Sequence, residues 1–233
     1  MPTNNSFEST AEQLNGGLIQ QVSRRRFLGY VGASSALLAT VASCKKDNAS
    51  TTSNGVDLGS GDVGILNYAY ALEQLEAAFY LMVVASPYSG ITTQEQTYLT
   101  DVRNHEVAHR EFFKAALGAS AIPALQVDFS SINFSNRDSV LGAAKAFEDL
   151  GVTAYNGAGH LLKDANYLTL AGKIVSVEAR HAALIRELIS LNSFADSTAV
   201  DANGLDGARQ PSEVLAIAGK YIITKIDASH LPS

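Results

Sequence analysis

Two Glu-x-x-His motifs are the residues of this sequence best suited to chemistry. The first pairs Glu106 with His109, and the second pairs Glu178 with His181. Residues three apart on a helix project from the same face, so each motif can present a carboxylate and an imidazole to one metal ion. Hard and borderline divalent metals accept these oxygen and nitrogen ligands. Metal binding is therefore the first chemistry that the sequence predicts.

A single glutamate and a tyrosine precede each motif in the same order. Glu73 is followed seven residues later by Tyr80, and Glu148 is followed seven residues later by Tyr155. Seven residues is close to two helical turns, so each glutamate shares a face with its tyrosine. The first glutamate precedes its motif by 33 residues and the second by 30 residues, so the chain looks internally duplicated.

The two halves together supply the ligand set of di-iron and di-manganese carboxylate bundles. Two ions close together need bridging glutamates, because one carboxylate cannot offset two cations. Cys44 is the only cysteine of the chain, so thiolate metal sites are excluded. We therefore predict a centre for two iron ions, or alternatively manganese, made of Glu73, Glu106, His109, Glu148, Glu178 and His181.

Two alternatives to this ligand set stay open. Glu76 lies one turn after Glu73, and it could be an additional ligand, a replacement for Glu73 or a solvated residue. His105, Glu106 and His109 also match the His-Glu-x-x-His motif of zinc proteases. That interpretation leaves the glutamates of the other helices unexplained, so we prefer the two-metal centre. His105 points about 100° away from Glu106 on a helix and is expected at the surface or beside a ligand.

Two helices joined by a short loop are expected in the first half. Apolar residues recur at three- and four-residue steps over residues 63–85, the period of a helix with one buried face. A second helix is expected from Thr92 or Thr93 to about Leu117, because a capping signal opens it and Gly118 can end it. The short loop predicts that the two helices lie antiparallel.

A long connection separates this pair from a second pair. Residues 119–136 carry dispersed polar residues and predict a crossover rather than an element. Further helices are expected over 137–163 and 168–191, and Pro211 predicts a shorter one to about residue 223. This connectivity is that of ferritin-like bundles. We predict an all-α, ferritin-like four-helix bundle with a long crossover between helices two and three, plus a short C-terminal helix.

The N-terminal region has the layout of a bacterial export signal. Arg24–Arg26 precede an apolar run of small residues that is too short for a comfortable membrane span. The opening resembles a twin-arginine signal, and the residues ending at Cys44 resemble a lipobox, in which the cysteine is acylated. We predict a signal over residues 1–44 with lipidation at Cys44, and a flexible polar tether over 45–61. An uncleaved anchor helix is the alternative.

The remaining chain divides into the bundle and a tail. We place the bundle at residues 62–192 and a C-terminal extension with the short helix at 193–233. The net charge of -6, without a cluster of basic residues after residue 50, argues against nucleic acid as a partner.

The central part of the chain resembles a known family. Leu72–Tyr80 and His105–His109 are similar to exported bacterial ferritin-like domain proteins of the desiccation-related type, within the ferritin-like superfamily. Pro211–Leu215 is similar to the closing segment of that family. The resemblance implies that Glu106 and Glu178 bridge the two metals. It further implies that Glu73 and His109 complete one metal shell, that Glu148 and His181 complete the other, and that Tyr80 and Tyr155 orient carboxylates by hydrogen bonds.

The resemblance also implies a range of functions. Carboxylate-bridged di-iron pairs react with dioxygen or peroxide, which implies a redox enzyme that oxidises iron(II) or detoxifies peroxide while anchored at a membrane outside the cytoplasm. A manganese catalase is a close variant. A non-catalytic envelope protein for stress or desiccation, in which the metals only hold the helices together, is the alternative from another class. Iron storage in a closed cage suits a lipid-anchored chain least, whereas a homodimer through the bundle face is compatible with it.

Overall fold

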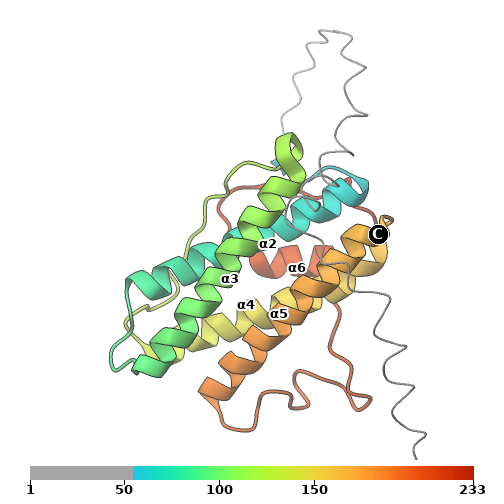
Figure 1. Cartoon of the computed structure of the whole chain (residues 1–233). Coiled ribbons are helices and arrows are strands. Elements are labelled where there is room, and N and C mark those ends of the chain that lie inside the picture. The colour runs from blue at the N-terminus through green and yellow to red at the C-terminus, as the bar shows by residue number, and fades with distance from the viewer. Residues whose placement is uncertain (1–54) are drawn as a thin grey trace, which may run out of the picture. The chain divides into compact units, whose positions relative to one another are not determined.

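The structure is a computed structural model, and it describes residues 55–233 of the chain. The predicted signal with its Cys44, and residues 45–54 of the predicted tether, lie outside the described residues. Five α-helices dominate the described part (Figure 1): α2 (Gly61–Ala85), α3 (Thr93–Leu117), α4 (Arg137–Ala158), α5 (Ala165–Ile189) and α6 (Pro211–Ala218). Between and around them lie the 3-10 helices η2 (Gly118–Ser120) and η3 (Gly159–Leu161) and the strands β1 (Val56–Asp57) and β2 (Ile226–Asp227).

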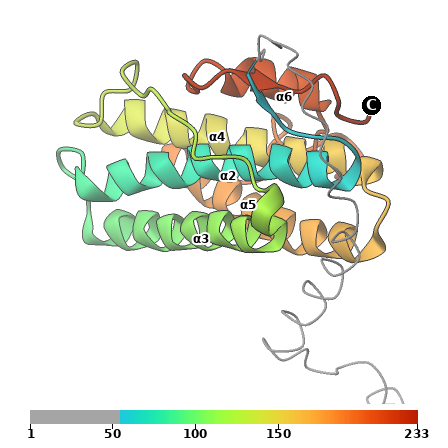
Figure 2. The same cartoon turned by 90° about the horizontal axis from the view of Figure 1, so that it is seen from above.

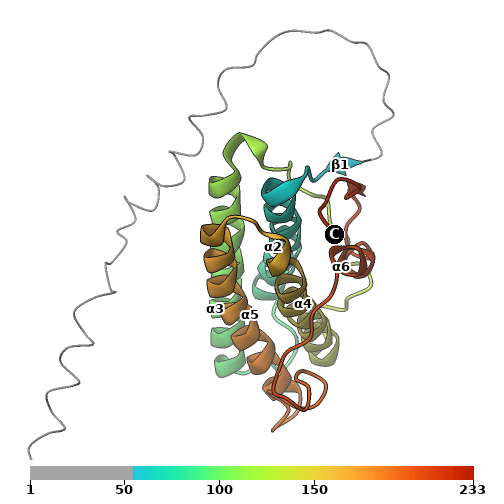
Figure 3. The same cartoon turned by 90° about the vertical axis from the view of Figure 1, so that its right-hand side faces the viewer.

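The four long helices pack as two pairs, α2 with α3 and α4 with α5. A short connection joins the members of each pair, and the long connection of residues 121–136 runs along α2 to the start of α4 (Figure 2). Figure 3 shows α6 outside the four long helices, against α4. The predicted all-α four-helix bundle, with a long crossover and a short C-terminal helix, is confirmed.

Two buried amides of α2 hold the crossover in place. The side chain of Asn67 donates to the carbonyl of Ser120 and accepts from the backbone N–H of Ile122. About two helical turns further along α2, the side-chain oxygen of Gln74 accepts a hydrogen bond from the backbone N–H of Leu125. Because the crossover covers α2, this helix is buried on nearly all sides. The expectation of one buried face was therefore wrong for α2.

Both ends of α3 lie where the sequence signals predict them. The Thr92 hydroxyl accepts from the backbone N–H of Glu95 at 3.1 Å, and the Glu95 carboxylate accepts from the backbone N–H of Thr92 at 2.9 Å. This reciprocal capping box opens α3, and Gly118, with a φ of 52°, follows its last residue. The Arg137 guanidinium donates to Glu95 at 2.8 Å and so joins the start of α4 to the start of α3.

Three predicted helix ends differ from the structure by three residues or more. The α-helical part of the third helix ends at Ala158 and tightens into η3, so it stops before residue 163. Because Asp164 caps the next helix by accepting from the N–H of Asn166, α5 begins at Ala165, earlier than expected. Helix α6 ends at Ala218 rather than near residue 223.

The C-terminal part of the predicted tether, which was expected to end at residue 61, belongs to the fold. Its residues Val56 and Asp57 form β1, which pairs in parallel with Ile226 and Asp227 of β2. The two strands are distant in sequence, so no local signal announces the pairing. No helix within residues 55–233 is both long enough and apolar enough to cross a membrane.

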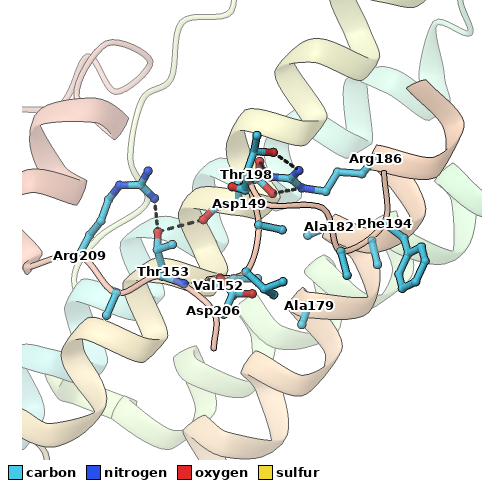
Figure 4. Close-up of a pocket in the computed structure, with 16 residues that line it drawn as sticks. Asp149, Val152, Thr153, Ala179, Ala182, Arg186, Phe194, Thr198, Asp206 and Arg209 are labelled. Carbon is cyan, nitrogen blue, oxygen red and sulfur yellow. Dashed lines mark hydrogen bonds and ion pairs between the residues drawn. The ribbon is translucent and has the colours of Figure 1, made fainter. Parts of the chain in front are cut away.

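A buried arginine fixes the segment that follows α5. Arg186 is 3% exposed, donates two hydrogen bonds of 2.8 Å to the carboxylate of Asp149 on α4, and donates another to the Thr198 hydroxyl. Further along, the backbone N–H of Arg209 donates to the carbonyl of Thr153. Figure 4 shows the contacts of Arg186, and the hydrogen bond from the Arg209 guanidinium to the Thr153 hydroxyl, around a pocket of about 430 Å³ between α4, α5 and this segment.

Candidate metal centre

All six predicted ligands meet in the middle of the bundle. Helix α2 contributes Glu73, α4 contributes Glu148, and each of α3 and α5 contributes one Glu-x-x-His motif. The four glutamates are 0% exposed, and His181 is 4% exposed. A carboxylate buried to this depth requires a partner of opposite charge, a proton or a cation. The remaining members of the cluster are Glu106, His109, Glu178 and His181.

The six residues form two overlapping groups that could each hold a metal ion. Within each group, one ligand atom from every residue lies within 4.8 Å of the others. The carboxylates of Glu106 and Glu178 belong to both groups. The first group adds Glu73 and His109 to this shared pair, and the second group adds Glu148 and His181.

Each histidine faces the glutamate of the opposite motif. Nδ1 of His109 lies 2.9 Å from Oε1 of Glu178, and Nδ1 of His181 lies 2.8 Å from Oε1 of Glu106. The same nitrogens lie within 3.5 Å of the lone glutamates Glu73 and Glu148, at 3.5 and 3.4 Å. The motifs on α3 and α5 therefore contribute to one centre rather than to two separate sites.

The two tyrosines also act across the halves. Tyr80 of α2 donates a hydrogen bond of 2.5 Å to Glu148 of α4, and Tyr155 of α4 donates one of 2.5 Å to Glu73 of α2. Each tyrosine shares a helix face with its own glutamate but bonds to the glutamate of the other helix. The hydrogen bonds take Oε1 of each lone glutamate and leave Oε2 facing the histidines.

The atoms that face the centre have no hydrogen bonds. Among the described residues, no hydrogen-bond partner exists for both oxygens of Glu106 and Glu178, for Oε2 of Glu73 and Glu148, or for Nδ1 of His109 and His181. The nitrogens and oxygens are close enough for ion pairing, but their alignment is not that of hydrogen bonds. Buried polar atoms without partners are rare. Carboxylate oxygens and imidazole nitrogens in this number fit a pair of divalent cations.

Burial and mutual repulsion shape the titration of the carboxylates. Burial raises the pKa of Glu73 to about 7, and burial together with the charges of Glu106 and Glu73 raises the pKa of Glu178 well above its usual range. Burial would also raise the pKa of Glu106, but His109 and His181 lower it to about 2. The metal-free cluster therefore holds protons on part of its carboxylates.

The histidines of the cluster are held in the charged form when no metal is bound. Burial alone would lower their pKa values, but contacts with Glu106 and Glu178 raise the pKa of His109 to about 12. Contacts with Glu106 and Glu148 raise the pKa of His181 to about 10. Metal ligation by these nitrogens requires that these protons leave.

Glu76 lies beside the cluster but belongs to neither group. It is 3% exposed, so the interpretation of Glu76 as a solvated residue was wrong. Its carboxylate approaches α4 at Gly151, where an added Cβ would lie 3.1 Å from Oε1 of Glu76 and 3.5 Å from Oε2 of Glu178. Because Glu73 contacts His109 and Glu76 does not, the geometry favours Glu73 in the first group. The sequence carried no signal that the missing side chain of Gly151 leaves space for the Glu76 carboxylate.

His105 is exposed on α3 and also belongs to neither group. Its Nδ1 lies 2.9 Å from Nε2 of His181, on the side of that ring away from the carboxylates. Burial, then the charges of His181 and His109, lower the pKa of His105. Neither group of ligand atoms contains both His105 and His109, so the two histidines do not share a metal position as the zinc-protease interpretation requires. The pocket in Figure 4 is lined by Ala179 and Ala182 but by none of the six cluster residues.

The fold and the cluster together define a class: a four-helix bundle with a buried carboxylate and histidine centre that could hold metal ions. A family model described as Ferritin-like domain matches residues 61–191, which include α2, α3, α4 and α5. The chain belongs to the ferritin-like domain family. No curated protein matches the chain.

Proposed function

We propose that the chain is a di-metal oxidoreductase that oxidises iron(II) or removes peroxide, with two iron ions at its centre and manganese as the alternative. The observation that carries this proposal is the sharing of Glu106 and Glu178 between two groups of ligand atoms. A shared carboxylate has one oxygen for each of two cations, whereas two independent sites would need separate glutamates. When bound, such a pair of iron ions supplies electron transfer between the divalent and trivalent states.

The residues of the chain have distinct roles in this proposal. Glu106 and Glu178 would hold both ions, while Glu73 with His109 and Glu148 with His181 would each hold one. The hydroxyls of Tyr80 and Tyr155 orient the lone glutamates, so that one oxygen of each stays directed at the centre. Complete burial of the glutamates excludes bulk water from the centre.

Activity is tested on full-length protein purified without added metal and then loaded anaerobically with iron(II). The proposal expects oxidation of the bound iron on addition of dioxygen or hydrogen peroxide. The increase in near-ultraviolet absorption measures this oxidation. The double variant E106Q/E178Q serves as the control, because glutamine keeps the side-chain volume but not the charge. Oxidation at the same rate in wild type and double variant would refute a role for the centre.

A second candidate is a protein in which the metals only hold the helices together. The observation that favours it is that Glu73, Glu106, Glu148 and Glu178 are all 0% exposed, so no carboxylate of the centre meets solvent in this structure. It predicts a metal-dependent rise in thermal stability and no turnover of peroxide. The same loaded protein, assayed for both properties, distinguishes the two candidates.

We further propose that the chain is exported by the twin-arginine route and anchored as a lipoprotein facing the periplasm or the cell surface. The support is the sequence of residues 1–44, with the arginines Arg24–Arg26 and the lipobox-like end at Cys44. Metabolic labelling with a radioactive fatty acid should label wild type and not C44A. Equal labelling of both would contradict lipidation at Cys44.

A further inference from the structure

We propose that His105 is a positioning residue that fixes the ring of His181, and that it makes the two metal positions unequal. The position served by Glu148 and His181 would bind its ion more tightly than the position served by Glu73 and His109. This inference rests on the proposed two-metal function. It assigns a role to a histidine that lies outside both groups of ligand atoms.

The contact between the two histidines is direct. Nδ1 of His105 lies 2.9 Å from Nε2 of His181, and the planes of the two rings are 7° apart. Because Nδ1 of His181 faces Glu106 and Glu148, its Nε2 is the nitrogen free to donate. His181 then carries its proton on Nε2 and donates it to Nδ1 of His105. This leaves the lone pair of Nδ1 in His181 available to a cation.

A hydrogen bond of this kind fixes both the tautomer and the orientation of a metal-binding histidine. His181 without a partner at Nε2 could rotate about its side-chain bonds or carry its proton on Nδ1. Either change removes the ligand atom from the centre. His105 lies on α3 and His181 on α5, so the contact also ties together the two helices that carry the motifs.

The other half of the duplicated pattern lacks this device. His105 immediately precedes Glu106, whereas the residue that immediately precedes Glu178 is Val177, which has no side-chain acceptor. Among residues 55–233, no atom forms a hydrogen bond with Nε2 of His109. The side chain of His109 is also more exposed, at 13% against 5% for His181. Among residues 55–233, therefore, only His181 of the two ligand histidines has a hydrogen-bond partner at the nitrogen that faces away from the centre.

The test uses the full-length chain and anaerobic titration with cobalt(II), whose visible absorption reports each ligand shell. Wild type should bind two ions in two steps of different affinity. In H105L the tighter step should weaken by about 10- to 100-fold, as for other lost partners of metal-bound histidines, while the weaker step keeps its affinity. H105N should restore the tighter step, because its side-chain oxygen can accept near the place of Nδ1.

Two controls separate positioning from a general loss of structure. His160 is exposed in η3, so H160L removes a surface histidine and should leave both steps unchanged. The metal-free forms of H105L and wild type should have the same helical circular dichroism spectrum, which shows that the variant folds. H105L with two unchanged steps would overturn the inference and leave the two-metal proposal intact. Equal weakening of both steps, or failure of H105N to restore the tighter one, would also overturn it; wild type that binds no cobalt(II) would instead refute the proposed function.

Discussion

The hydroxyl of Tyr155 on α4 donates a hydrogen bond of 2.5 Å to Glu73 on α2. In the opposite direction, the hydroxyl of Tyr80 on α2 donates a hydrogen bond to Glu148 on α4. The two duplicated halves therefore orient each other's lone glutamates rather than their own. This exchange links α2 to α4 through the centre, although these helices belong to different pairs.

Y155F should weaken both the fold and the metal centre. A hydrogen bond contributes roughly 0.5–1.5 kcal/mol between neutral groups and roughly 1.5–3 kcal/mol when the acceptor is charged, and its loss leaves Oε1 of Glu73 buried without a donor. We expect a lower free energy of unfolding for the metal-free chain, measured by urea denaturation, together with weaker metal binding. Y167F is the matched control, because Tyr167 is only partly buried and its hydroxyl contacts no cluster residue. A Y155F chain as stable as Y167F would contradict the role of the hydroxyl.

The metal-free chain should lose stability as the pH rises from about 5 to 8. Glu73 holds its proton up to about pH 7 in the folded chain but only to 4.5 when exposed, so folding takes up a proton between these values and stability falls as the pH rises through them. His109 and His181 extend the decline, since their pKa values are raised from 6.5 to about 12 and about 10. The shift of Glu73 alone corresponds to on the order of 3 kcal/mol.

Thermal unfolding of metal-free protein across this pH range measures the effect. E73Q removes the titrating group and should flatten the curve between pH 5 and 7. Metal loading should also flatten it, because ligation replaces the protons of the cluster. A melting temperature that rises with pH over this range in the metal-free wild type would show that the cluster is not protonated as described.

G151A should destabilise the chain and disturb the centre. The added methyl would lie 3.1 Å from Oε1 of Glu76 and 3.5 Å from Oε2 of Glu178, so it would crowd two buried carboxylates. Overpacking of this kind costs about 1–3 kcal/mol. G142A on the same helix is the control, since a Cβ there meets no atom within 4 Å and alanine favours a helix over glycine. G142A should be more stable than wild type. If G151A were also more stable than wild type, the packing of the buried Glu76 side chain would not depend on the missing side chain of Gly151.

R186A should release the segment after α5 from the bundle. Arg186 is 3% exposed and binds Asp149 through two hydrogen bonds, so its loss leaves a carboxylate and the Thr198 hydroxyl without their donor. Breaking a buried pair costs roughly 3–5 kcal/mol, and the partial exposure of Asp149 reduces this figure. Hydrogen exchange over residues 194–200 should accelerate. R110A breaks an exposed pair with Glu111 and should change stability by less than about 1 kcal/mol.

The sequence could predict the bundle and the six cluster residues because both rest on local spacing. A glutamate on the apolar face of a helix, such as Glu73 or Glu148, is buried, and a buried carboxylate must be paired with a cation or bind a metal. The cap at Thr92 and the stop at Gly118 are likewise read from neighbouring residues, and the structure has both.

The features that the sequence could not predict depend on contacts between distant segments. The burial of Glu76 depends on the missing side chain of Gly151, and the exchange of tyrosine partners depends on how α2 meets α4. The burial of α2 on nearly all sides follows from the crossover held by Asn67, and β1 pairs with a strand near the other end of the chain. None of these contacts leaves a periodic trace in the local sequence.

The most direct test of the two-metal centre is the metal content of full-length protein after anaerobic loading with iron(II) and removal of free metal, measured by mass spectrometry of the elements. We predict two iron ions per chain for wild type and loss of both in E106Q/E178Q, because these two glutamates belong to both ligand groups. Wild type that retains no iron or manganese, or a double variant that retains as much as wild type, would contradict the account.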